Sequence, residues 1–417
     1  MVHGELWTIK EFFTYPNEYI YWPITIVMYP FVTGLVAGAF VLSSLYHVFG
    51  VKQLKDIARF SLVFSFALLP VAMMPLLLHL SQPFRGIEVM LTPHFTSAIA
   101  AFGIVFSTYG MIVASELWFV YRKHFVLKSL ELKEKTNRNG LDSIFYLLFS
   151  ALTLGAYDIS EHALEKDEKA VGILAGIGIP VACFLHGYVG FIFWSVKSNA
   201  LWTTPLMPVI FLCSAVVSGV ALCIVTYVIT VGLRNLLYIR KRTQNPELPK
   251  DESVKDVDLS EIKITTKYLV MFLILAFTLE FIDLIFRGYT GVKSWDILQV
   301  VIFKIDFVKI FILQYGIGNL LPFILLLLPG LTVKRAVLAS ALVLFGVFMM
   351  RWNVVIGGQA FSSSFSGFME YHMPILPLGL DATKEGLIGT IAVIITPYVL
   401  FFGLNKIMPV FGQTDSH

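Results

Sequence analysis

The sequence has little charge for its length. Of its 417 residues only 14% are Asp, Glu, Lys or Arg, whereas 57% are hydrophobic, and the mean hydropathy is +0.77. A soluble globular protein of this size needs more polar surface than that. The apolar residues form long runs rather than the short alternating segments of an outer-membrane barrel, and a bilayer core requires such runs to satisfy their backbone hydrogen bonds as helices. The sequence therefore predicts an all-α polytopic membrane protein.

Cysteine is scarce as well. Cys183, Cys213 and Cys223 lie in apolar segments and show no C-x-x-C spacing, so we expect no iron–sulfur cluster and no zinc site in this chain. The N-terminal residues lack a basic region followed by an apolar run and a small-residue cleavage site. We therefore expect the first span itself to direct membrane insertion.

The apolar runs predict nine transmembrane helices. A further apolar segment, 143–159, is only just long enough to cross a bilayer, so we interpret it as a short cytoplasmic or half-embedded helix; ten spans are the alternative. The nine predicted spans cover about residues 20–49, 57–80, 97–121, 170–196, 206–233, 268–286, 303–328, 336–356 and 387–408.

Basic residues predict the orientation of these spans. They gather around Lys52 and Arg59, in 122–138, in 234–263, and at Lys334 and Arg335, which the positive-inside rule places in the cytoplasm. The chain is then a multi-pass protein of the cytoplasmic membrane, with its N-terminus outside and its C-terminus inside.

Spacing and composition also suggest how the chain is divided. We expect an interfacial N-terminal segment (1–19), a first transmembrane bundle (20–200), a second bundle (201–356), and an outer loop with a C-terminal span (357–417). Gly34 and Gly38 lie four residues apart in the first span, a spacing that lets two membrane helices approach closely. We expect this face to pack inside the bundle.

Five polar side chains are predicted near the outer rim. His79, Arg85 and His94 flank or follow the second span, while His186 and Tyr188 lie in the outer half of the fourth. Neutral His and Tyr can hydrogen-bond a quinone carbonyl and exchange protons, which quinol oxidation requires. The alternatives are that they tie helices together by hydrogen bonds, or that His79 and His186 ligate one b-type haem.

Ionisable side chains inside the spans form a second group of candidates. Each is costly in a bilayer unless it is paired or hydrated, so we expect pairing across helices. Three of them recur every three or four residues and share one helical face. The group could provide a proton path to the quinone or could form structural ion pairs; it comprises Glu280, Asp283, Arg287, Asp306, Arg351 and Glu116.

Four segments in order resemble one known family. They are YPFVTGLVAGAFVLSS, LHLSQPFRGIEVMLTPHFTS, IPVACFLHGYVGFIFWSVKSNALWTTPLMPVIFLCSAVVSG and MRWNVVIGGQAFS. Together they are similar to the NrfD/polysulfide reductase membrane subunits (PsrC- and HybB-like). Within that family the long form with RWNVVIGGQ is most similar to the DsrP-type subunits of DsrMKJOP complexes.

The resemblance implies two four-helix bundles, a menaquinone site near the outer surface, and no haem or iron–sulfur cluster in this chain. The site would involve His79, the turn at 83–85 and Tyr188; many family members carry an acidic residue in place of His79, which leaves the proton acceptor open. The implied function is electron exchange between menaquinol and a periplasmic ferredoxin-like iron–sulfur subunit in sulfur metabolism, with proton translocation in some members.

The same resemblance implies further partners in such a complex. They are a cytochrome b-type membrane subunit, a multihaem cytochrome c and a cytoplasmic iron–sulfur subunit. Alternatives are the membrane anchor of a hydrogenase or polysulfide reductase, a b-haem cytochrome, or a transporter without redox function. No nucleic-acid partner is expected, because the basic residues act as topology signals.

Overall fold

The computed structural model describes residues 20–94, 96–135, 139–196, 199–245, 256–290, 295–361, 368–376 and 379–411. The predicted interfacial segment, 1–19, lies outside the described residues. Over the described ranges the regular structure is helical, as the composition predicts.

Nine helical units in the described ranges are long and apolar enough to cross a membrane, which confirms the predicted count. They are α1 (Ile24–His47), the unit η3–α2–α3 (Lys52–Leu54, Lys55–Ala72, Met74–His79), α5 (Ala100–Glu134), α7 (Glu161–Ser195), α8 (Met207–Gln244), α9 (Leu259–Thr290), η6–α11 (Val308–Leu320, Leu321–Leu327), α12–η7 (Val333–Trp352, Asn353–Gly357) and α14 (Leu387–Ile407).

Shorter helices connect or flank these units. The segment predicted at 143–159 is α6 (Gly140–Leu152), whose 13 residues are too few to cross a bilayer. The others are η4 (Pro83–Ile87), α4 (Glu88–Leu91), α10 (Trp295–Val300), η5 (Val301–Ile305) and α13 (Leu380–Glu385).

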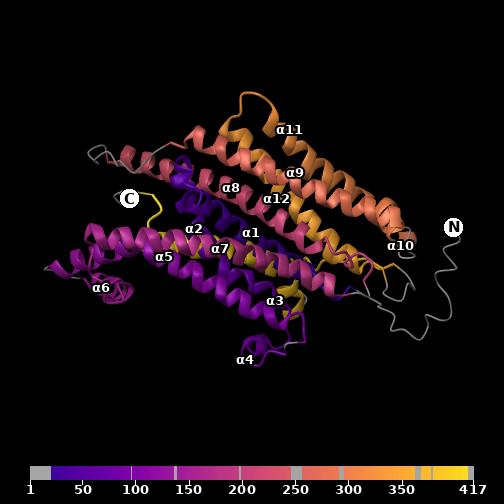
Figure 1. The fold of residues 1–417 in the computed structure, drawn as a ribbon, viewed down its shortest axis with the longest axis horizontal. Coiled ribbons are helices and arrows are strands. Elements are labelled where there is room, and N and C mark those ends of the chain that lie inside the picture. Colours follow the sequence, from indigo (N-terminus) through magenta and orange to yellow (C-terminus); the bar gives the residue numbers. More distant parts are fainter. Residues whose placement is uncertain are drawn as a thin grey trace.

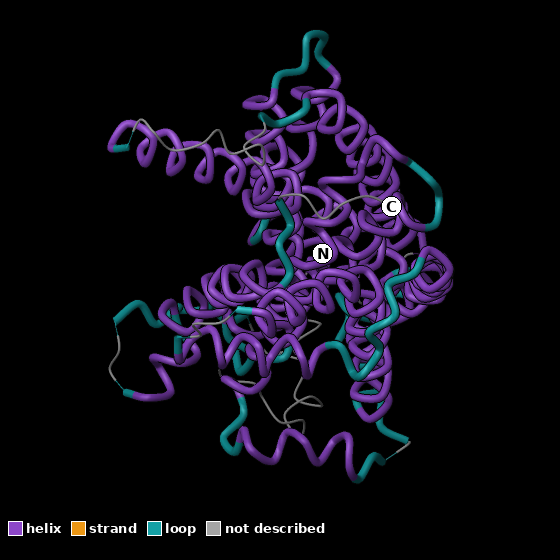
Figure 2. Tube along the Cα trace, turned by 90° about the vertical axis from the view of Figure 1, so that its left-hand side faces the viewer, coloured by secondary structure: helices purple, strands orange, loops and turns teal. Residues whose placement is uncertain are grey.

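The long helices run along the long axis of the molecule (Figure 1). The end near α6 carries the turn with Lys52 and the basic end of α8, and we call it the basic end; α3, α4 and α10 lie toward the other end, which we call the rim end. Figure 2 views the bundle from the basic end, where helices are seen along their axes. The positive-inside rule predicts that the basic end faces the cytoplasm, and this orientation stays a prediction.

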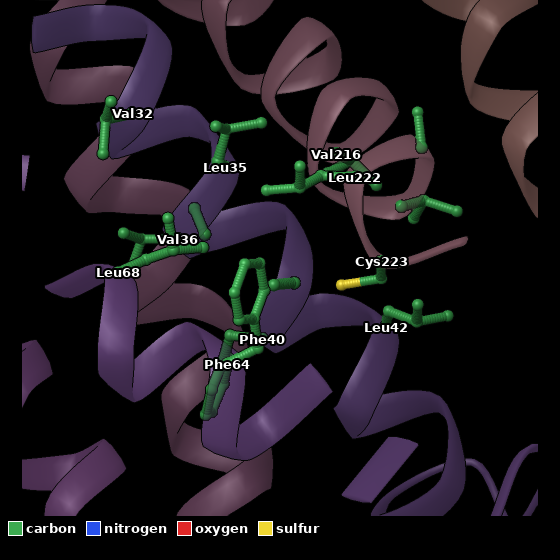
Figure 3. Packing of buried hydrophobic residues seen from close by; sticks show 14 of the residues in the cluster. Val32, Leu35, Val36, Phe40, Leu42, Phe64, Leu68, Val216, Leu222 and Cys223 are labelled. Atoms are coloured by element: carbon green, nitrogen blue, oxygen red, sulfur yellow. The ribbon is translucent and has the colours of Figure 1, made fainter. Parts of the chain in front are cut away.

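Helix α1 lies at the centre of the core. It packs against α8, α2 and α7, and 20 of its 24 residues are buried. Figure 3 shows apolar side chains of α1, α2 and α8 meeting there, with Phe40 beside Phe64. Helix α8 also packs against α9 and α12, so it contacts both predicted bundles. The division near residue 200 stays a prediction.

Two prolines, Pro70 and Pro75, lie in the second unit, and the helix is interrupted between them. Helix α2 ends at Ala72, and α3 starts at Met74 with Pro75 in its first turn. Proline lacks an amide hydrogen and its ring clashes with the preceding turn, which interrupts the helix at Met73. This break leaves His79 at the end of a separate short helix.

Two pairs of glycines bring helix backbones into direct contact. A Cβ added to Gly38 of α1 would lie 2.2 Å from the Ala215 carbonyl oxygen and 2.8 Å from the Gly219 Cα of α8. A Cβ on Gly318 of η6 would lie 2.1 Å from the Gly346 Cα of α12. The inward face predicted for Gly38 is confirmed, and only a residue without a side chain fits at these crossings.

We expect Gly38→Ala to lower the thermal unfolding temperature of the purified chain, because the new methyl group forces α1 away from α8 at a cost of about 1–3 kcal/mol. Gly176→Ala is the matched control, since a Cβ there meets nothing within 4 Å. Equal unfolding temperatures for the two variants would contradict the close α1–α8 crossing.

Candidate functional site: a polar rim and a membrane-embedded hydrogen-bond network

His79 is held at the rim end by a carboxylate from a distant part of the chain. It is the last residue of α3, and its Nδ1 lies 3.2 Å from the Glu385 Oε1 at the end of α13. Both side chains are about one-quarter exposed, at 28% and 26%. A carboxylate only accepts hydrogen bonds, so Nδ1 donates and the Nε2 lone pair remains available as a base.

Arg85 lies in η4, next to α3, and is paired with Glu88. The guanidinium donates to both carboxylate oxygens, at 2.9 and 3.0 Å, and this hydrogen bonding raises the pKa of Arg85. Large apolar side chains in and after this turn are exposed: Phe84 is 96% exposed and Leu91 is 70% exposed. The rim therefore combines charged groups with apolar surface.

The remaining rim candidates contact the segment between α4 and α5. Tyr188 of α7 donates a hydrogen bond to the Ala98 carbonyl at 2.7 Å, and the His94 Nδ1 lies 2.7 Å from the Thr96 hydroxyl. Tyr188 thus anchors this segment to α7, whereas His94 makes a local, exposed contact.

His186 is not a rim residue. It is fully buried in α7, and its Nε2 lies 3.1 Å from a guanidinium nitrogen of Arg351 on α12. Arginine only donates, so Nε2 accepts and the imidazole is neutral with its proton on Nδ1. His79 therefore pairs with Glu385, and His186 pairs with Arg351. The two imidazoles do not face each other, as the two axial ligands of one haem would.

Arg351 of α12 is held by two neighbouring helices, α7 and α8. The same nitrogen donates to the Ser214 hydroxyl at 2.7 Å and to the Phe211 carbonyl at 3.3 Å, and the guanidinium carbon lies 3.8 Å from the centre of the Phe211 ring. Among the described residues no carboxylate lies within 4.0 Å of Arg351. Hydrogen bonds and the aromatic face stabilise its charge at close range, and the Glu280 carboxylate contributes from a longer distance.

A chain of three side chains links α9, η6 and η7. Gln314 donates to the Glu280 carboxylate at 2.8 Å, and Asn353 donates to the Gln314 carbonyl oxygen at 2.8 Å. Glu280 was predicted from its charge. Gln314 and Asn353 were missed, although an amide within an apolar run is itself a sign of a membrane-embedded polar site.

Two ion pairs form within single segments rather than across helices, so the expectation of cross-helix pairing is wrong for them. Arg287 donates to Asp283 at 2.8 Å, four residues earlier, and Lys309 donates to Asp306 at 2.7 Å, three residues earlier. Arg287 also donates to two backbone carbonyls, and Asp283 accepts a short hydrogen bond from Thr204.

These groups surround one cavity of about 110 Å³. Glu280, Asp283 and Arg287 line it from α9, which confirms their shared face, and Gln314 and Asn353 line it from η6 and η7. Its walls include three π-helical segments, η5, η6 and η7. π-Helical turns are rare in proteins, and those that do occur are often found at functional sites.

Glu116 lies apart from this network. It is fully buried in α5, and neither carboxylate oxygen has a hydrogen-bond partner among the described residues. The described residues also contain no cluster of three or more His, Cys, Asp or Glu side chains placed to hold a metal ion.

Comparison with known proteins gives one family and several relatives. The family profile described as polysulphide reductase, NrfD, matches residues 14–363. A selenate reductase subunit of Mesobacillus selenatarsenatis is 31% identical over 217 residues, which are 51% of this chain and 49% of that protein. The chain thus spans about half the length of that relative.

Two other relatives match over more of the chain. A putative dimethyl sulfoxide reductase membrane subunit of Halobacterium salinarum is 24% identical over 81% of this chain and 69% of its own length. An Hdr-like menaquinol oxidoreductase integral membrane subunit of Archaeoglobus fulgidus is 23% identical over 82% and 72%.

We expect Arg351→Met to reduce the free energy of unfolding by about 1–3 kcal/mol, because His186 and Ser214 lose their buried donor. The measurement is thermal or denaturant unfolding in detergent, with the exposed Arg240→Met as control. A double-mutant cycle with His186→Phe tests the pair directly, and strictly additive effects would contradict a direct Arg351–His186 interaction.

Proposed function

The chain belongs to the polysulphide reductase NrfD family, and on that basis we propose that it is the quinone-reactive membrane subunit of a respiratory oxidoreductase complex. It exchanges electrons between menaquinol in the bilayer and an iron–sulfur subunit bound at the rim end. The relatives are named as subunits of a selenate reductase, a dimethyl sulfoxide reductase and a menaquinol oxidoreductase, which supports this class of complex.

The His79–Glu385 pair is the observation that carries the proposal. Quinol oxidation releases two electrons and two protons, so the site needs a base at the position where the quinol hydroxyl binds. His79 offers Nε2 to that hydroxyl, while Glu385 fixes the ring and stabilises the imidazolium that forms. The exposed apolar side chains around Phe84 provide a surface for the isoprenoid tail and ring.

Electrons leave the chain by a different route from the protons. We propose no haem or iron–sulfur cluster in this chain, so the quinone binds within reach of the partner's cluster at the rim end. The further partners that we propose are a cytochrome b-type membrane subunit, a multihaem cytochrome c and a cytoplasmic iron–sulfur subunit, in a complex of sulfur metabolism like DsrMKJOP.

The cavity network provides a path for protons in this proposal. Glu280, Gln314 and Asn353 form a continuous hydrogen-bonded chain across α9, η6 and η7. The side chains of Asp283, Arg287 and Asp306 add charged groups to the largely apolar lining of the same cavity. Glu280 is the member that takes up and releases the proton, while the Gln314 and Asn353 amides orient the water molecules that carry it to and from the carboxylate. In this proposal the path links quinone turnover to translocation.

We expect His79→Ala to slow quinol-dependent reduction of the partner's iron–sulfur clusters by about 100-fold or more, since a positioned base contributes about 10²–10⁴ in rate. Glu385→Gln retains an acceptor for Nδ1 but removes the charge, so its loss is smaller, about tenfold. The assay uses the assembled complex and stopped-flow absorbance.

The exposed His162→Ala at the basic end is the matched control for this experiment. Co-purification of the partner subunits confirms assembly in each variant. If His79→Ala and Glu385→Gln both turn over like His162→Ala, the proposed quinone site is wrong.

We expect Glu280→Gln and Gln314→Leu to decrease the number of protons translocated per quinol in proteoliposomes, because each interrupts the chain at a different member. Quinol oxidation by itself continues, since both residues lie away from His79. Glu165→Gln, an exposed substitution in α7, serves as control. A proton yield that stays at the control value in both variants would rule out this path.

A further inference from the structure

A second cavity lies at the basic end and belongs to none of the sites described above. It has a volume of about 200 Å³ and lies between the end of α1, the start of α2, the inner part of α5 and the start of α7. Its lining combines cationic side chains with an apolar wall, the two features that an amphipathic anion needs.

The charges lining this cavity favour an anion. Lys55 and Arg59 enter from α2 and Lys123 from α5, whereas Asp167 and Glu168 enter from α7. The Asp167 carboxylate is already paired with Arg122 at 2.6 Å, and both of those side chains are largely buried. The lining therefore has more cationic than anionic side chains, three against two.

The Arg122–Asp167 pair fixes the side of the cavity that α5 and α7 form. Arg122 donates to the backbone carbonyls of Ala156 and Asp158, at 3.2 and 2.6 Å, and so fixes the segment between α6 and α7. Ser160 donates to the Asp158 carboxylate and lowers the pKa of Asp158. The start of α7 is thereby held in place beside α5.

The apolar side of the cavity points to a lipid rather than to a free ion. Leu127 lines the cavity and is 47% exposed, so the cavity reaches apolar outer surface. Helix α6 borders it, with Phe149 packed against the His124 ring at 6.0 Å between centroids. The outer face of α6 exposes Leu141 and Leu147, which is typical of a helix lying in the membrane interface.

We infer that this cavity binds the phosphate of an anionic phospholipid, with the headgroup between Lys55, Arg59 and Lys123 and the acyl chains along Leu127 and α6. Basic pockets between membrane helices on the cytoplasmic side have this function where anionic lipids are available. The site is independent of quinone chemistry, and its test does not depend on the function proposed above.

The test is native mass spectrometry of the full chain released from nanodiscs that contain phosphatidylglycerol and phosphatidylcholine. We expect one phosphatidylglycerol to be retained by the wild type, and its dissociation constant to rise roughly 100-fold in Lys55→Gln/Arg59→Gln/Lys123→Gln, from about fivefold per charge near the membrane surface. The matched control is Arg240→Gln/Lys241→Gln/Arg242→Gln, which removes the same charge from the exposed end of α8.

Three outcomes would overturn the inference. They are equal retention by the two triple variants, equal retention of phosphatidylcholine by the wild type, and displacement of the lipid by inorganic phosphate at comparable concentration, which would indicate an ion site. If the first triple variant loses its monodisperse elution profile, the single variant Arg59→Gln replaces it, and the comparison of lipids and phosphate on the wild type still decides.

Discussion

A guanidinium enclosed between apolar membrane helices is the constraint on which the centre of this structure depends. Leaving the Arg351 charge without partners in a bilayer interior would cost several kcal/mol, so the helices around it must supply hydrogen bonds. His186 on α7 and Ser214 on α8 do so, and the Phe211 ring covers the charge. These contacts fix α12 to α7 and α8, the helices that also pack against α1.

The same requirement explains why so many polar groups occur in pairs or chains. The Glu280–Gln314–Asn353 chain joins three helical segments, whereas the Asp283–Arg287 pair satisfies its charges locally and then reaches backbone carbonyls. The two glycine crossings join helices in a different way, because they use close backbone contact and no polar side chain. Close packing and polar satisfaction together hold the bundle.

Much of this architecture could be predicted from the sequence, because span length, proline and glycine act locally. The nine spans follow from the length of the apolar runs, the break before His79 from proline, and the inward face of Gly38 from the spacing of the glycines. Partner choice could not be predicted, since it depends on how each helix is rotated. Glu385 was missed for that reason: it lies more than 300 residues from His79 and pairs with it only in three dimensions.

The π-helical segments have a consequence for how this family can vary. A π-helical turn holds about one residue more than an α-helical turn, so it can absorb an inserted residue and leave the helix beyond it in register. Removing one residue from η6 would let the segment return to α-helical geometry and change the directions of the side chains within it, Gln314 among them. A one-residue insertion or deletion is therefore a discrete way to turn a polar side chain toward or away from the cavity without rebuilding the bundle.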